Sequence, residues 1–177
     1  MNQSPLSFFI FFLLFLETVL NNHVNVEYMA SYQYQAMWAY FDRDDVALPH
    51  IAEFFKKMSN EELGHAHEFQ KYLNSRGGQV RLLEMAPPEH EFAATDSKSD
   101  ALLAFEKALE LEKSVYQQLL LLHQTAGKQN DPNFEDKVEG YLEEQVESIK
   151  KFAEYVSQLT RLGTSGSAVY MFDNEFE

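Results

Sequence analysis

Acidic side chains, a histidine and a tyrosine recur at helical spacing within stretches that are otherwise apolar. Glu62 and His65 are three residues apart and Glu27 and Tyr34 are seven apart, so each pair shares one face of a helix. Two further stretches hold polar groups whose direction the periodicity does not fix: Glu106, Glu110 and Glu112, and Glu143, Glu144 and Gln145. A charge on the buried face of a helix is costly unless it is paired or binds a metal.

This combination of side chains suits a redox-active divalent metal. Carboxylate oxygens with an imidazole favour Fe²⁺ or Mn²⁺, and the chain has no Cys to form a closed thiolate zinc site. Two adjacent ferrous ions can pass two electrons to O₂ without releasing a radical, and a nearby tyrosine can hydrogen-bond a ligand or carry an electron. Glu-x-x-His is the motif of di-iron helix bundles, but a solvated pair on a Glu-rich helix has the same spacing.

The composition excludes several other classes. The chain has 177 residues, which predicts one domain. Its 14 basic and 28 acidic residues give a formal charge of −14, which repels nucleic acid and attracts cations. The absence of Cys excludes a disulfide scaffold and a cysteine nucleophile, and 7 Gly with 5 Pro disfavour an all-β chain.

Apolar periodicity predicts an all-α protein with four long helices. The first ends near Phe41; the others span about 49–76, 97–125 and 132–162, and a short fifth helix covers about 167–176. Asp96 or Ser97 is the expected N-cap of the third helix, and Asp131 followed by Pro132 opens the fourth.

The lengths of the connections predict the topology. The first and second helices are joined by a short link, as are the third and fourth, whereas about 18 residues from Gly78 to Thr95 join the second to the third. This pattern predicts an antiparallel four-helix bundle with one long crossover, in which the two middle helices run parallel, as in ferritin-like bundles.

The N-terminus is unusual, and we separate residues 1–16, an atypical apolar segment, from a domain at 17–177. The apolar run 6–16 is too short to span a bilayer. It has the length of a signal-peptide core but no preceding Lys or Arg, so a targeting segment and an apolar start of the first helix both remain open. We expect a cytoplasmic protein, with the secretory pathway as the alternative if the run is a signal. The run is also the only motive for a membrane-associated bundle.

Several ordered segments resemble one family over about residues 17–176. They include NVEYMASYQY (25–34), YFDRDDVAL (40–48), NEELGHA (60–66), NSRGG (74–78), ALELEK (108–113), NDP (130–132) and YLEEQV (141–146). These segments resemble ferritins of the catalytic heavy-chain kind. The resemblance implies a 24-mer cage, built of this chain alone or mixed with other subunits, that oxidises Fe²⁺ with O₂ and stores the ferric mineral.

The resemblance also implies a di-iron centre through which substrate iron passes. The first iron site would use Glu27, Glu62 and His65, and the second would share Glu62 and add Glu112. Gln145 stands where a second Glu-x-x-His would place its histidine. A non-catalytic subunit that only builds the cage is the alternative, and this set of ligands argues against it.

Other positions carry roles that the resemblance implies. Tyr34 matches the tyrosine beside the centre, and Glu61 and Glu144 match acidic positions that help iron transfer. Channel residues on the threefold axes would be Asp136, Glu139, Glu135 and His123.

The chain also departs from the family pattern at three places. Gly64 stands in place of a carboxylate, which weakens the expected mineral-nucleating surface unless His67 substitutes. The crossover is longer around 95–99, and the apolar run 6–16 replaces a polar N-terminal arm.

Overall fold

The structure is a computed structural model that describes the backbone of residues 5–176 and the side chains of residues 16–176. It contains five helices: α1 (Pro5–Phe41), α2 (Pro49–Ser75), α3 (Asp100–Lys128), α4 (Pro132–Leu162) and α5 (Gly166–Asn174). No strand occurs in the part of the chain that the structure describes. Helix α1 is continuous through most of the predicted N-terminal segment, whose first four residues lie outside the described residues.

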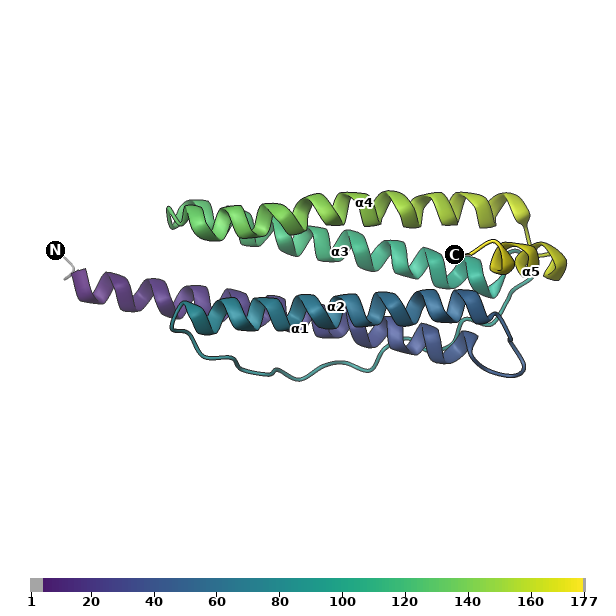
Figure 1. The fold of residues 1–177 in the computed structure, drawn as a ribbon, viewed down its shortest axis with the longest axis horizontal. Coiled ribbons are helices and arrows are strands. Elements are labelled where there is room, and N and C mark those ends of the chain that lie inside the picture. The colour runs from purple at the N-terminus through teal and green to yellow at the C-terminus, as the bar shows by residue number, and fades with distance from the viewer. Residues whose placement is uncertain (1–4, 177) are drawn as a thin grey trace.

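The four long helices form the predicted bundle (Figure 1). Helices α1 and α2 pack as one antiparallel pair, and α3 and α4 pack as the other. A connection without helix, residues 76–99, runs the length of the bundle, so that α3 starts at the same end as α2 and runs parallel to it. Helix α5 lies across the end where α2 and α3 begin. The predicted all-α fold with one long crossover is therefore confirmed.

The start of α3 differs from the prediction. Its N-cap is Ser99, whose side chain accepts the N–H of Leu102 at 3.2 Å, so the expectation that Asp96 or Ser97 caps the helix is wrong. The reason is a local turn in which the Thr95 hydroxyl accepts the backbone N–H of Lys98 at 3.0 Å. This turn includes the residues just before Ser99, so the helix begins only after them.

The other predicted helix boundaries agree to within three residues. Helix α4 begins as expected, because Asp131 accepts the N–H of Phe134 and Pro132 takes the first helical position. Helix α3 ends at Lys128 rather than near Thr125, and α5 spans Gly166–Asn174 rather than 167–176.

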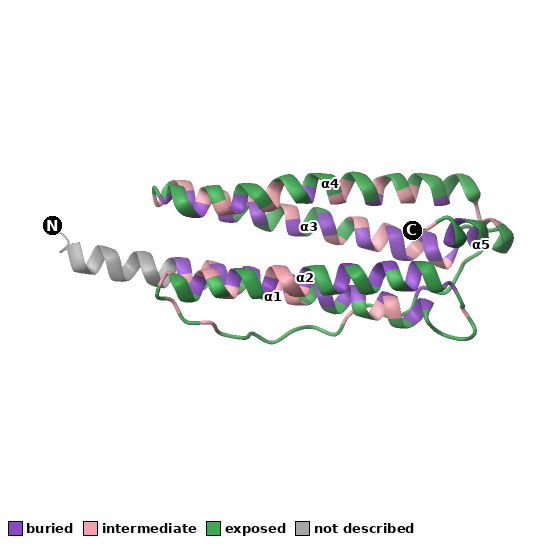
Figure 2. Ribbon diagram, viewed as in Figure 1, coloured by how far each residue is buried: buried purple, intermediate pink, exposed green. Residues whose placement is uncertain are grey.

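The apolar core consists of two clusters stacked along the bundle. The cluster near α5 includes Phe55, Phe105 and Phe152, whereas the opposite cluster includes Leu20 and Phe69. On three long helices a buried polar residue lies in sequence between the parts that feed these clusters: Glu62 on α2, Glu112 on α3 and Gln145 on α4. Glu27 of α1 is also buried, but it lies between Val24 and Ala30 of the second cluster. Buried residues line the inner faces of the helices (Figure 2).

The crossover is held against α1 by two amide side chains. Asn21 donates to the carbonyl of Gln79 at 2.9 Å, and its Oδ1 accepts the N–H of Arg81 at 2.6 Å. Gln33 makes the same pair of bonds with the backbone of Glu89, at 2.8 and 3.0 Å. These bonds satisfy backbone groups that an extended segment without a neighbouring strand would leave unpaired.

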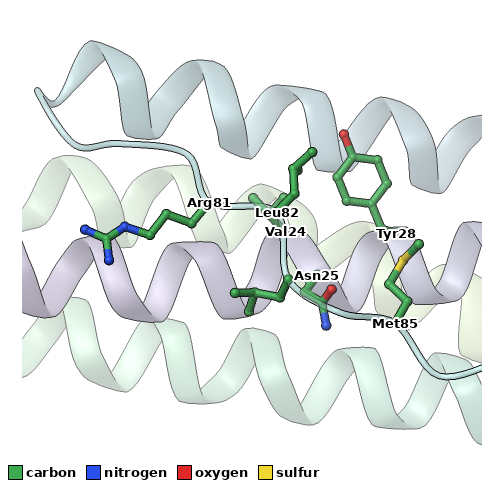
Figure 3. Close-up of a pocket in the computed structure, with 7 residues that line it drawn as sticks. Val24, Asn25, Tyr28, Arg81, Leu82 and Met85 are labelled. Atoms are coloured by element: carbon green, nitrogen blue, oxygen red, sulfur yellow. The ribbon is translucent and has the colours of Figure 1, made fainter.

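A groove of about 230 Å³ lies between α1 and the crossover. Figure 3 shows it lined by Val24, Asn25 and Tyr28 from α1 and by Arg81, Leu82 and Met85 from the crossover. No carboxylate lines this groove, so it is distinct from the buried polar residues in the middle of the bundle. Among the described residues, no helix has the length and apolar character needed to cross a membrane.

Candidate metal centre

All four long helices contribute a polar side chain to the middle of the bundle. Glu27 comes from α1, Glu62 from α2, Glu112 from α3 and Gln145 from α4. The exposed fractions of the three carboxylates are 1%, 3% and 1%, respectively. A solvated pair at Glu62 and His65 is therefore excluded, because Glu62 faces the core.

Two overlapping groups of donor atoms meet at His65. Glu27, Glu62 and His65 each offer an atom within 4.8 Å of the other two, and so do Glu61, His65 and Glu144. His65 Nδ1 lies 3.2 Å from Glu62 Oε2, and its Nε2 lies 3.3 Å from Glu144 Oε1. Because Glu61 and Glu144 are exposed, His65 links a buried group of donors to an exposed one.

Glu112 has partners for both carboxylate oxygens. The Tyr34 hydroxyl donates to Oε1, and the Gln145 side-chain amide donates to Oε2 and, at 3.1 Å, to the backbone carbonyl of Glu112. The structure thus places Tyr34 and Gln145 at Glu112, on the side of the centre expected for the second iron. Glu112 is not part of either group of close donor atoms found among the described residues.

Burial disfavours the ionised form of the carboxylates at the centre. Burial raises the pKa of Glu27 to about 7, that of Glu62 to about 8 and that of Glu112 to about 7. Burial alone would lower the pKa of His65, but its hydrogen bond with Glu62 and the surrounding carboxylate charges raise it to about 9. Carboxylates that resist ionisation here would ionise readily beside a divalent cation.

Sequence reasoning missed one member of this environment, His23. It lies one turn before Glu27 on α1, is 2% exposed, and places Nε2 2.7 Å from Glu27 Oε1. Burial lowers the pKa of His23 to about 3, so the ring is neutral. The apolar stripe through Leu16, Leu20 and Val24 could have identified it, because His23 falls on that stripe.

The predicted channel residues lie away from the centre, where α3 ends and α4 begins. His123 Nε2 is 3.1 Å from Glu139 Oε1, so these two positions are brought together. Asp136 and Glu139 are exposed and Glu135 is half-buried. Within one chain they form an acidic surface and not an enclosed channel.

Comparison with known proteins agrees with this geometry. The ferritin-like domain matches residues 17–162. The chain is 51% identical to chloroplastic ferritin-3 of Arabidopsis thaliana over 160 residues, covering 90% of this chain and 61% of that protein. It is 50% identical to chloroplastic ferritin-3 of Glycine max, covering 89% and 61%. The crystal structure of ferritin from the green alga Ulva pertusa superposes with a TM-score of 0.87 at 48% identity, covering 91% of this chain and 82% of that one.

These relatives also bear on the expected location. The chain spans about three fifths of the length of the chloroplastic relatives. Their names place them in chloroplasts, so the expectation of a cytoplasmic protein is not supported. The domain match, the identity and the shared fold establish the family: the chain belongs to the ferritins.

Proposed function

We propose that the chain is a catalytically competent subunit of an iron-storage cage, and that it oxidises Fe²⁺ at the buried carboxylate centre. The first Fe²⁺ would bind Glu27, Glu62 and His65, whose donor atoms already lie within 4.8 Å of one another. The second would share Glu62 and bind Glu112, with Gln145 beside it. The observation that carries the proposal is that carboxylates from three helices, Glu27, Glu62 and Glu112, are buried together in the middle of the bundle, with His65 beside them.

The chemistry that this site supports is a two-electron reaction. Two substrate Fe²⁺ ions each lose one electron, and O₂ takes up both electrons with two protons to give hydrogen peroxide. The carboxylates stabilise the increase in charge as the iron becomes ferric. Tyr34 holds Glu112 through its hydroxyl, which fixes the orientation of one carboxylate without adding charge.

Iron must also enter and leave the centre. Glu61 and Glu144 are exposed beside the half-buried His65, and we infer that they pass iron between the solvent-facing side and the buried donors. Gln145 is a weaker ligand than a histidine would be, which favours release of oxidised iron over its retention.

We extend the proposal to the assembly, because two of the named relatives are plant ferritins and the solved structure is an algal one. The chain would form a 24-mer cage, alone or with other ferritin subunits. The acidic group at Asp136, Glu139, Glu135 and His123 would line its threefold channels and concentrate cations there. We also infer a plastid location from these relatives, which fractionation of plastids followed by immunoblotting would test.

A non-catalytic subunit is the alternative, and the retained donor set argues against it. The decisive variant is Glu62→Ala, because Glu62 is the only carboxylate proposed to bind both irons. The matched control is Glu53→Ala, which removes an exposed carboxylate from the same helix. Absorbance would be followed by stopped flow after Fe²⁺ is mixed with aerated protein.

The two variants should differ in the rate of iron oxidation and agree in assembly. We expect Glu62→Ala to lose the rapid phase of ferric absorbance and Glu53→Ala to keep the parental rate, while light scattering after size exclusion shows the same cage for both. A parental initial rate in Glu62→Ala would refute the assigned centre.

A further inference from the structure

His23 is a buried polar side chain that the proposed reaction leaves without a role. Its exposed fraction is 2%, and neither ring nitrogen has a hydrogen-bond partner among the described residues. Oε2 of Glu27 is likewise buried without a partner. Unpaired polar groups of this kind are costly in a protein interior, so the arrangement calls for a partner that completes it.

The geometry around His23 points to Glu27. Nε2 of His23 is 2.7 Å from Oε1 of Glu27, one helical turn away, but the two groups are not aligned as a hydrogen bond. The edge of the imidazole meets the ring of Phe69, with the two centroids 4.5 Å apart at 90°. Phe69 therefore restricts the ring, and a small rotation of the Glu27 carboxylate is the simplest movement that aligns the pair.

A cation at the proposed centre would cause that rotation. It would attract one oxygen of Glu27 toward Glu62 and His65, the other members of the donor group. The second oxygen would then face the imidazole at hydrogen-bonding distance. Ligating carboxylates in metalloproteins are commonly held by a second hydrogen bond of this kind.

We propose that His23 is a positioning residue of the metal centre: its imidazole donates the Nε2 hydrogen to Oε1 of Glu27 and thereby holds that carboxylate toward the bound cation. His23 does not itself bind the metal. This role rests on the proposed metal centre and adds to it a residue outside the set that binds iron.

The test uses variants that separate hydrogen bonding from packing. His23→Gln keeps an N–H donor on a side chain of similar reach, whereas His23→Leu keeps an apolar volume and removes the donor. His90→Leu, at an exposed histidine of the crossover, is the matched control. Zn²⁺ binding to the assembled, iron-free protein is measured by titration calorimetry, because Zn²⁺ binds without oxidation. Subtracting the isotherm of Glu62→Ala removes binding at other sites.

We expect His23→Leu to weaken Zn²⁺ binding at the centre by roughly 10- to 100-fold, the usual effect of removing a hydrogen bond to a ligand. His23→Gln should restore most of the affinity, and His90→Leu should match the parent. The visible spectrum of the Co²⁺ form should be the same in the parent and in His23→Gln, because the set of ligands is unchanged.

Each contrary result has a distinct meaning. Parental Zn²⁺ affinity in His23→Leu would overturn the positioning role and leave the metal centre intact. A Co²⁺ spectrum that changes in His23→Gln would show that His23 is a ligand, which also overturns the proposal. Unchanged Zn²⁺ binding in Glu62→Ala would instead refute the metal centre, and with it the role given to His23.

Discussion

Glu61 and Glu62 are adjacent in sequence, yet the helix directs them to different environments. Glu62 is 3% exposed and joins Glu27 in the core, whereas Glu61 is exposed and joins Glu144 at the surface. Successive residues of a helix point about 100° apart, so two neighbouring carboxylates can serve the inside and the outside of one site. His65, three residues after Glu62, contacts Glu62 through one ring nitrogen and Glu144 through the other.

The raised pKa values of Glu62 and His65 predict that metal binding releases protons. In the metal-free protein these values are about 8 and about 9, so at about pH 7 both groups hold protons that a cation must displace. Zn²⁺ affinity should therefore rise with pH from about 7 to about 9 and level off above that range. Calorimetry in two buffers with different ionisation enthalpies gives the number of protons released. A number near zero at pH 7 would contradict the prediction.

The sequence alone predicts only part of this site. The spacing of Glu62 and His65 shows that they share a face, but it cannot choose among Glu106, Glu110 and Glu112. Only the packed structure shows that Glu112 is buried and Glu110 exposed. Assigning Glu112 from sequence therefore depends on family resemblance. The apolar stripe of α1 signals that His23 is buried, but its spacing does not connect it with Glu62 and His65 on another helix, so it was missed.

At the level of the helices, α5 supplies the N-cap hydrogen-bond acceptor that the start of α2 lacks. Leu48, the N-cap residue of α2, has no side chain that can accept a hydrogen bond. Asp173 of α5 supplies the acceptor: its Oδ1 accepts the N–H groups of His50 and Ile51 at 3.1 and 2.9 Å. The sequence predicts a fifth helix but not this contact, because the partners are 122 or more positions apart.

Asp173→Ala should destabilise the subunit by about 0.5–2 kcal/mol, the range for loss of an N-cap. Asp173 is 1% exposed, so water cannot easily replace the lost acceptor. Thermal unfolding of the iron-free protein would measure the effect. The control is Glu175→Ala, at an exposed neighbour, which should unfold at the parental temperature. Equal midpoints for both variants would show that the cap contributes nothing.

The N-terminal apolar run gives a prediction about assembly. Leu16 and Leu20 of α1 belong to the core. We predict that deleting residues 2–13 leaves cage formation and iron oxidation intact and raises solubility, because an apolar run on the outer surface of a cage would promote aggregation. Size exclusion with light scattering checks assembly. A longer deletion, 2–21, removes Leu16 and Leu20 and should fail to assemble. If the shorter deletion also fails, the run packs in a subunit interface.

For the whole molecule, connection lengths predicted the topology well. Short links force neighbouring helices to be antiparallel, and a link of about 18 residues can traverse a bundle. What they could not predict is where the crossover lies. That depends on Asn21 and Gln33, two amide side chains of α1 that bind crossover backbone more than 55 positions away. The division between residues 1–16 and the domain that follows stays a prediction.

The acidic surface near the start of α4 gives a prediction about iron uptake. Asp136→Asn with Glu139→Gln should slow uptake into the cage while leaving the buried centre unchanged, because it removes two carboxylates from each subunit around every proposed channel. Added salt should slow the parent more than the double variant, since exposed charges are screened over about 8–10 Å. Uptake is followed by ferric absorbance at several salt concentrations. Equal salt sensitivity would refute the channel assignment.

The division of the core into two apolar clusters has a mechanical consequence. The buried carboxylates Glu62 and Glu112 lie in sequence between the parts of α2 and α3 that feed these clusters, and they add no apolar packing there. Iron ions that share Glu62 and also bind Glu27 and Glu112 would tie α1, α2 and α3 together at this level, and their departure would loosen it. Amide hydrogens near this level should then exchange with solvent faster in the empty subunit than in the filled one. The rigidity of the wall of the cage would thus follow the passage of iron through it.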